Sequence, residues 1–344
     1  MRSQYRLLLS IQFIVILFLS SFLRGEVSPS FQLSWPTPNP AFAKGMGYSA
    51  FLQKTGPDKA FSSGAFGCVR NNGYKFHEGL DLYPIKRDPR GRAEDSIYAA
   101  MEGLVVHANN ISGHSAYGKY VVLEHNSVAP TLYSLYGHLD SIDPVLKKGV
   151  TIKVAQKIGK MGNSASYRIP LNRSHLHFEI GLRLTDDFQS WYNTKKFSSL
   201  NRHGNYSGFN LVGIDPLPFY SKYRAKAFAT PLDYINSLPK EAKIRIRTKK
   251  IPDFAKRYPE LCSFFPRNKS WNGWECIFGP YGLPLKLQQT DGCNETDPFI
   301  KIISYDISQH DRQCRRLIDR SSGRLVPAEQ LELYIELLFG VTLG

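Results

Sequence analysis

Three short segments of the chain carry residue types that can bind a metal ion and transfer protons. They are His77-Glu78-Gly79-Leu80-Asp81, Tyr136-Gly137-His138-Leu139 and His175-Leu176-His177-Phe178-Glu179. Side chains alternate along a β-strand, so His175 and His177 point to one face of a strand. His77 and Asp81 share a face if their segment is extended, and Gly79 between them disfavours a helix. Two imidazoles and a carboxylate gathered in this way predict a zinc site with three protein ligands and an open fourth position, as catalytic zinc sites have.

The order of these segments resembles the lysostaphin/LytM-type peptidases, which are the M23 family of zinc metallopeptidases. Four further segments match the family pattern, at residues 97–106, 117–125, 147–152 and 158–164. The resemblance covers residues 70–182, and it is specific because several weak matches occur together in the family's order. It implies a mainly β fold: a compact antiparallel β-sheet domain whose cleft holds the metal. Short β-branched and aromatic runs between residues 97 and 180 independently favour strands.

The resemblance also implies roles for five residues. Matched residue by residue, the metal ligands for one Zn²⁺ per chain are His77, Asp81 and His177. The catalytic histidines beside the metal are His138 and His175. Zinc would lower the pKa of its bound water to roughly 7, and the two histidines would exchange protons with that water and with the leaving amine.

The chain departs from the family pattern beside the expected cleft. Residues 165–173 form a longer connection than usual before the last motif, and Ser174 stands where the family commonly has Pro. Residues 86–95 are a charged insertion soon after the first motif. Loops that border a cleft often carry specificity, so these insertions either reshape the substrate groove or are ordinary solvated loops.

Length and composition set broader limits. The chain has 344 residues, of which 42% are hydrophobic, and this suits a folded protein of about two domains. Its formal net charge of +15 favours polyanionic surroundings such as nucleic acid, an anionic membrane or an acidic cell-wall polymer, without choosing among them. The resemblance implies peptidoglycan, through its peptide stems or cross-links, as the partner, and no nucleic acid.

Residues 1–25 predict export. A short basic head precedes a long apolar run, a pattern typical of a secretory signal peptide. An uncleaved N-terminal anchor in the membrane is the alternative. In either case the rest of the chain is expected in the periplasm, in the cell envelope or outside the cell.

Residues 26–69 are expected to form an extended lead that packs on the core, because their proline-rich start suits neither a helix nor a central strand. Cys68 is interpreted as a small core side chain, since buried free cysteines usually behave as hydrophobes. The alternative is a latent form, in which the Cys68 thiolate masks the zinc. Asn71 or Asn72 are alternative fourth ligands in such a latent form.

The zinc peptidase domain is expected at residues 70–220, with Asp215-Pro216-Leu217-Pro218 as its terminator. Residues 221–344 are expected to form a second, smaller α+β domain, a basic module that contains disulfides. Its cysteines predict two bridges with three alternative pairings, among Cys262, Cys276, Cys293 and Cys314.

Two elements of this C-terminal module have recognisable patterns. Residues 243–247 alternate basic and apolar side chains, which predicts a half-buried strand with a basic face. That face either holds an anionic polymer or is an ordinary solvated surface. An amphipathic helix is expected to start at Pro327 and to bury Leu331, Ile335 and Leu338.

These observations together predict an exported zinc metalloendopeptidase that cuts peptide bonds in peptidoglycan cross-links or bridges. The alternative is a non-catalytic envelope protein of the same fold that binds and activates cell-wall amidases. Members of that kind usually lack some metal ligands, whereas this chain keeps all three and both further histidines. A secreted peptidase that acts on other proteins would share the same site. The sequence does not indicate the oligomeric state.

Overall fold

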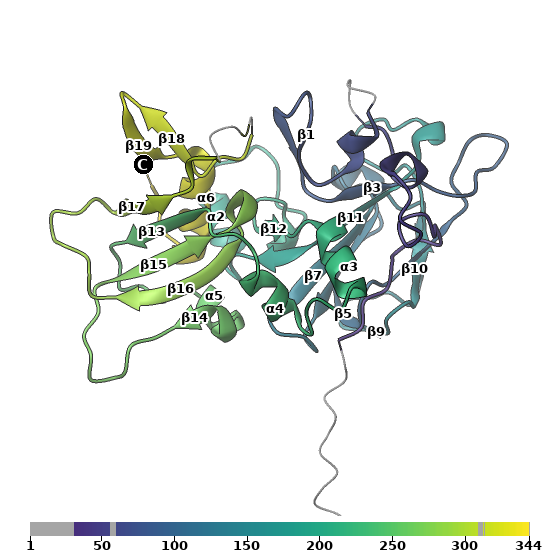
Figure 1. Ribbon diagram of the computed structural model, residues 1–344. Coiled ribbons are helices and arrows are strands. Elements are labelled where there is room, and N and C mark those ends of the chain that lie inside the picture. The colour runs from purple at the N-terminus through teal and green to yellow at the C-terminus, as the bar shows by residue number, and fades with distance from the viewer. Residues whose placement is uncertain (1–30, 56–59, 309–311, 313, 344) are drawn as a thin grey trace, which may run out of the picture. The chain divides into compact units, whose positions relative to one another are not determined.

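Antiparallel sheets make up most of the computed structural model, which describes residues 31–55, 60–308, 312 and 314–343 (Figure 1). Residues 32–344 form one compact unit. Within the described ranges, no helix is both long enough and apolar enough to cross a lipid bilayer. The signal peptide or anchor predicted over residues 1–25 lies outside the described residues.

A seven-stranded antiparallel sheet forms the larger part of the fold. Its strands pair in the order β12 (Leu211–Gly213), β11 (Leu176–Arg183), β7 (Leu132–Gly137), β6 (Tyr120–His125), β5 (Gly103–Asn109) and β9 (Thr151–Ile152), and β3 (Leu80–Leu82) also pairs with β11. A smaller sheet contains β4 (Ser96–Tyr98), β10 (Lys157–Lys160) and β8 (Ser141–Ile142). A hairpin joins β1 (Gly67–Arg70) to β2 (Lys75–His77).

The central strands of the large sheet are buried on both faces. Every residue of β7 and of β11 is buried. One cluster of the core contains Tyr120, Val122, Tyr133, Leu135, Tyr206 and Leu211. Burial of each large apolar side chain contributes roughly 1.5–3 kcal/mol, so a one-residue slip of a strand would be strongly unfavourable. The resulting register places His177 opposite Asp81 on one side and opposite Gly137 on the other, which brings the three motifs together.

A second sheet lies in the C-terminal part of the chain (Figure 1). Its strand order is β14 (Cys262–Ser263), β16 (Pro284–Thr290), β15 (Gly273–Phe278), β13 (Ala242–Ile246) and β17 (Ile300–Tyr305). A further hairpin joins β18 (Ile318–Ser321) to β19 (Arg324–Pro327). The described α-helices are α2 (Phe188–Thr194), α3 (Pro216–Arg224), α4 (Pro231–Asn236), α5 (Phe254–Arg257) and α6 (Glu329–Phe339).

The prediction of a mainly antiparallel β fold with a smaller α+β part is confirmed. The expected basic strand is β13, in which Lys243 and Arg245 alternate with buried isoleucines. Both cations pair with Glu275, at 2.6 and 2.7 Å, so the charge of this face is partly balanced within the sheet. The amphipathic helix is α6, but its predicted start was wrong, because Pro327 ends β19.

The predicted disulfides within the C-terminal module are wrong. Cys314 is bonded to Cys68, which lies 246 positions earlier, while Cys262, Cys276 and Cys293 are free thiols. Cys262 and Cys276 lie on the two strands that flank β16, so a whole strand separates them. Because Cys68 is oxidised, it is neither the free core thiol nor the metal-masking thiolate considered above.

The segment expected to terminate the peptidase domain starts a helix instead. The carboxylate of Asp215 accepts a 3.0 Å hydrogen bond from the backbone N–H of Leu217, and Pro216 occupies the first turn of α3. Aspartate at the N-cap followed by proline is a favourable helix start. The predicted boundary at residue 220 lies inside α3, and the division of the chain into domains remains a prediction.

The chain before the first strand packs against α3. Trp35 stacks on Phe42, with ring centroids 4.5 Å apart, and meets Tyr220 edge-on at 5.0 Å. Pro36 accepts a 2.9 Å backbone hydrogen bond from Tyr98 in β4. These contacts hold the N-terminal segment to the outside of the fold that carries the site.

Candidate active site

The link between β2 and β3 holds His77 and Asp81 above β11. His77 ends β2, and Asp81 is the middle residue of β3. Between them, Gly79 lies directly on the backbone of β11, where an added Cβ would be 2.2 Å from the carbonyl oxygen of Phe178. Only glycine allows so close an approach without moving a strand. Both side chains therefore reach His177 of the same strand.

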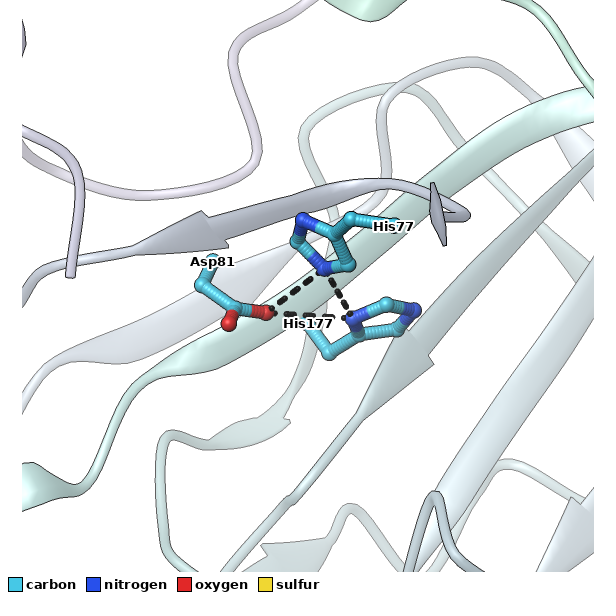
Figure 2. A group of neighbouring side chains, drawn as sticks. All are labelled: His77, Asp81 and His177. Atoms are coloured by element: carbon cyan, nitrogen blue, oxygen red, sulfur yellow. Dashed lines mark hydrogen bonds and ion pairs between the residues drawn. The ribbon is translucent and has the colours of Figure 1, made fainter. Parts of the chain in front are cut away.

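Three donor atoms from these residues form a nearly equilateral triangle. Nε2 of His77, Oδ1 of Asp81 and Nδ1 of His177 are separated by 3.1, 3.1 and 3.2 Å (Figure 2). All three residues are buried. Donor atoms about 2.0–2.1 Å from a tetrahedral zinc ion stand about 3.3 Å from one another, so this triangle fits three corners of such a site.

Hydrogen bonds at the far side of each imidazole select the matching tautomer. Nδ1 of His77 donates a 2.7 Å hydrogen bond to the carbonyl of Ala65, which leaves the Nε2 lone pair free. Nε2 of His177 donates to Glu179 at 2.8 Å, which leaves Nδ1 free. The second oxygen of Glu179 accepts a 2.9 Å hydrogen bond from Tyr133. Such outer contacts orient metal-binding histidines, so the residues fit zinc in chemistry as well as in distance.

The outer oxygen of Asp81 is also held. Oδ2 accepts hydrogen bonds from Arg70 at 2.5 Å and from Thr55 at 3.1 Å. Burial disfavours the charged carboxylate, but electrostatic interactions with His77, His175 and Arg70 hold the pKa of Asp81 well below its usual range. The carboxylate is therefore ionised and oriented, as a metal ligand must be.

The electrostatics of the triangle favour a cation at its centre. Burial lowers the pKa of His77. Burial also opposes protonation of His177, yet hydrogen bonds to Asp81 and Glu179 raise its pKa to about 9. Two carboxylates thus stabilise positive charge at this point, whether it is a proton or a metal ion.

Two further histidines face the same place. Nδ1 of His175 donates a 2.7 Å hydrogen bond to the carbonyl of Arg173, and Nδ1 of His138 donates at 2.8 Å to that of Ser164. Each ring therefore keeps a free Nε2, and that of His175 is 3.5 Å from Oδ1 of Asp81. The two ring centroids are 4.8 Å apart. Burial lowers the pKa of both residues, so both are neutral and able to accept a proton.

A cavity of about 300 Å³ opens onto these side chains, and its wall includes Asp81, His138, His175 and His177. Thr55, Arg70 and Tyr117 are among the wall residues that were not predicted as part of the site. The ring of Tyr117 lies 5.4 Å from that of His177. Its backbone carbonyl accepts a 2.7 Å hydrogen bond from His138, whose φ of 59° is unusual for a residue with a side chain. Neither Thr55 nor Arg70 belongs to a motif, and Tyr117 only begins the family-matched segment 117–125, so the fold brings these three residues to the cavity.

The two insertions have different roles. Residues 165–173 contribute to the cavity wall, whereas no described wall residue belongs to 86–95. Instead, Arg87 donates hydrogen bonds to the hydroxyl and the carbonyl of Ser174 at 2.9 and 3.0 Å. The same hydroxyl accepts a 2.8 Å hydrogen bond from the backbone of Ala93. Ser174 therefore connects residues 86–95 by hydrogen bonds to the end of loop 165–173, directly before His175.

Comparisons with known proteins agree with this arrangement. Residues 75–187 match Peptidase family M23. A protein named Lipoprotein NlpD/LppB homolog, from Pseudomonas aeruginosa, is 32% identical over 114 residues, which cover 33% of this chain and 32% of that protein. Peptidoglycan DD-endopeptidase ShyB of Vibrio cholerae is 38% identical over 87 residues, which cover 25% of this chain and 18% of that protein. The chain thus spans a third or less of the length of these curated relatives.

Among solved structures, a zinc-containing peptidase from Vibrio cholerae is 30% identical, with a TM-score of 0.25. The match covers 38% of this chain and 31% of that chain. The residues that match the family, 75–187, contain the donor triangle and both further histidines. The sequence of residues 75–187 therefore has the pattern of peptidase family M23.

Proposed function

We propose that the chain is an exported zinc-dependent endopeptidase that hydrolyses peptide bonds in the cross-links or bridges of peptidoglycan. The observation that carries this proposal is the donor triangle of His77, Asp81 and His177, with the free Nε2 atoms of two neutral histidines facing the same cavity. The peptidase family of residues 75–187 supports the reaction class. Similarity to a protein named a peptidoglycan DD-endopeptidase supports the substrate.

His77, Asp81 and His177 would hold the zinc ion. When bound there, zinc supplies a Lewis acid that polarises the scissile carbonyl and makes water more acidic. His138 and His175 provide the proton transfers. Their Nδ1 atoms are fixed on backbone carbonyls, so Nε2 of either ring can accept a proton from water and return it to the leaving amine. Since both imidazoles are buried and neutral, they are poised as bases rather than as fixed cations.

Export is supported by two independent features. Residues 1–25 have the composition of a signal peptide or an N-terminal anchor. The Cys68–Cys314 disulfide joins distant parts of the chain, and structural disulfides persist mainly in oxidising compartments outside the cytoplasm. We therefore place the protein in the periplasm, in the cell envelope or outside the cell.

A non-catalytic envelope protein that binds and activates cell-wall amidases is the alternative. A protein of that kind has no need for a complete metal triangle or for two aligned histidines. The chain keeps all five residues, and their outer hydrogen bonds are in place. This completeness favours the enzyme.

The experiment that tests the proposal uses purified peptidoglycan and the zinc-loaded full chain. The readout is the release of new amino groups, compared between wild type and the His175→Ala variant, with zinc content measured in both. We expect release by wild type and a loss of about 100-fold or more in a variant that still holds zinc. Absence of release by wild-type protein with one zinc per chain would refute the endopeptidase.

A further inference from the structure

Three cations in the cavity wall have no carboxylate partner. Lys75, Arg168 and Arg173 line the same cavity as the donor triangle. None of them takes part in an ion pair with the described residues, although many other basic side chains of the fold do. Lys75 and Arg168 are exposed to the cavity, and Arg173 is half-buried.

The remaining charged wall residues are already neutralised by protein groups. Arg70 pairs with Asp81 at 2.5 Å. Glu78, the other acidic wall residue, pairs with Arg315 at 3.2 Å. The uncompensated charge of the wall therefore comes from Lys75 and the two arginines. A cavity of this kind concentrates anions, because its low-dielectric wall focuses the field of the cations.

The two arginines stand on a fixed loop rather than a mobile one. The backbone of Ser166 donates a 2.8 Å hydrogen bond to Ser115, and the carbonyl of Ile169 accepts a 2.7 Å hydrogen bond from Asn163. Nη2 of Arg173 donates to the carbonyl of Lys54 at 3.0 Å, which orients this guanidinium, and its other donors have no partner among the residues that the structure describes. The backbone of loop 165–173 and the guanidinium of Arg173 are thus held by hydrogen bonds, and the exposed side chain of Arg168 extends from this loop.

These groups lie close to the reacting centre. The backbone carbonyl of Arg173 is the acceptor for Nδ1 of His175, at 2.7 Å, and the side chain of Arg173 lines the cavity onto which His175 opens. Tyr167, next to Arg168 in the sequence, also lines the cavity. Burial and the charge of Asp81 raise the pKa of Tyr167, whereas the charges of Arg70 and Arg173 lower it, so all of these groups share one neighbourhood.

We propose that Lys75, Arg168 and Arg173 form a carboxylate-binding subsite, and that this cleft selects peptides with a free carboxylate beside the scissile bond. The inference rests on the proposed function and specifies its substrate class. A guanidinium offers two parallel N–H donors that match a carboxylate, and Arg168 and the free donors of Arg173 are available for it. An anionic peptide fits better than an extended anionic polymer, because the three cations line the same cavity as the donor triangle and are not spread along a face of the molecule.

The test compares one substrate in two charge states. Soluble peptidoglycan fragments are used as isolated and after conversion of their carboxylates to amides with carbodiimide and ammonia. For the zinc-loaded full chain, we expect amidation to lower kcat/KM at least about tenfold. The double variant Arg168→Gln/Arg173→Gln should lose about as much on native fragments and nothing further on amidated ones.

Two other variants complete the design. Arg90→Gln/Arg267→Gln removes the same net charge from exposed arginines outside the cavity wall and should behave as wild type. Lys75→Gln is a second probe of the subsite, since Lys75 is exposed and its loss leaves no buried group unpaired. Equal losses in the control and subsite variants would refute local recognition, as would equal cleavage of both substrates.

Calorimetric binding of the same fragments to zinc-free protein separates this inference from the proposed function. If zinc-free protein binds native fragments preferentially but zinc-loaded protein never cuts them, the subsite is supported and the endopeptidase is refuted. Cleavage without a preference for carboxylates would refute the subsite and support the endopeptidase. Fragments that are neither bound nor cut would contradict both. Competition by inorganic phosphate as strong as that by native fragments would show a general anion site and overturn the peptide selection.

Discussion

His177 donates a hydrogen bond from Nε2 to Glu179, two residues further along β11, at 2.8 Å. The strand's alternation points both side chains to the same face, so one strand supplies a donor atom of the triangle and the group that orients it. Glu179 is 1% exposed and also accepts a hydrogen bond from the hydroxyl of Tyr133. A buried carboxylate that contacts a metal-binding histidine sets both its tautomer and its basicity.

Replacing Glu179 should therefore weaken metal binding without removing a ligand. We expect Glu179→Gln to lower zinc affinity about 10- to 100-fold, as losses of such outer partners typically do. Tyr133→Phe removes only one hydrogen bond to Glu179 and should have the smaller effect. Competition with a chromophoric chelator measures both affinities, and an unchanged affinity in Glu179→Gln would show that His177 needs no orienting partner.

Ser174 should be important for stability rather than for chemistry. In Ser174→Ala, the buried backbone N–H of Ala93 and one donor of Arg87 lose their acceptor. We expect the free energy of unfolding to fall by about 1–3 kcal/mol. Urea denaturation of Ser174→Ala beside Ser166→Ala, which removes an exposed hydroxyl from the neighbouring loop, measures this difference. Equal stability of the two variants would contradict the role assigned to Ser174.

The buried His125 predicts a loss of stability in mild acid. Burial lowers its pKa from 6.5 to about 4 in the folded chain. There its ring nitrogens form hydrogen bonds with the backbone carbonyl of Glu102 and with the hydroxyl of Ser134. Above pH 6.5 both the folded and the unfolded forms are neutral, and the residue has no pH effect. As the pH falls from 6.5 toward 4, only the unfolded chain takes up the proton, so stability decreases.

Between pH 7 and pH 5, this residue should account for a decrease of about 2 kcal/mol in the free energy of unfolding. The decrease should be smaller by that amount in His125→Asn, even though this variant is less stable at neutral pH. His114→Asn, at a less buried position, should retain the wild-type dependence. The same pH dependence in both variants would exclude His125 as its source.

The disulfide gives a prediction for thiol chemistry. Of the five cysteines, the fold leaves Cys262, Cys276 and Cys293 free, so titration of the unfolded, unreduced protein should find three thiols. Pairing within the C-terminal part would leave one. We also expect Cys314→Ser to lower the free energy of unfolding by about 2–4 kcal/mol, because the bridge closes a long loop. Cys293→Ser is the matched control and should be close to wild type.

The sequence predicted those parts of the molecule that depend on local pattern. Strand-like alternation placed His175, directly before β11, and His177, within β11, on one face, and the alternation of Lys243 to Ile246 predicted β13. The order of the motifs indicated which residues meet, although not that register sets Asp81 directly opposite His177. The roles of the five site residues remain a proposal.

The features that could not be predicted from the sequence depend on contacts between distant segments. The prediction paired cysteines that lie near one another in the sequence, so it could not find a disulfide between residues 246 positions apart. Arg70 and Thr55 reach the cavity from outside the motifs, and Tyr117 begins the matched segment 117–125 without having been predicted as a wall residue. The prolines after Asp215 were interpreted as a stop, yet proline within the first turn behind an N-cap starts a helix equally well.

The central claim is that His77, Asp81 and His177 bind the zinc on which peptide hydrolysis depends. The most direct measurement determines zinc per chain and amino-group release from peptidoglycan on the same purified sample, beside His177→Ala. We predict one zinc per chain with hydrolysis in wild type, and loss of both in the variant. A wild-type chain without zinc and without hydrolysis, or a variant that keeps both, would contradict the account.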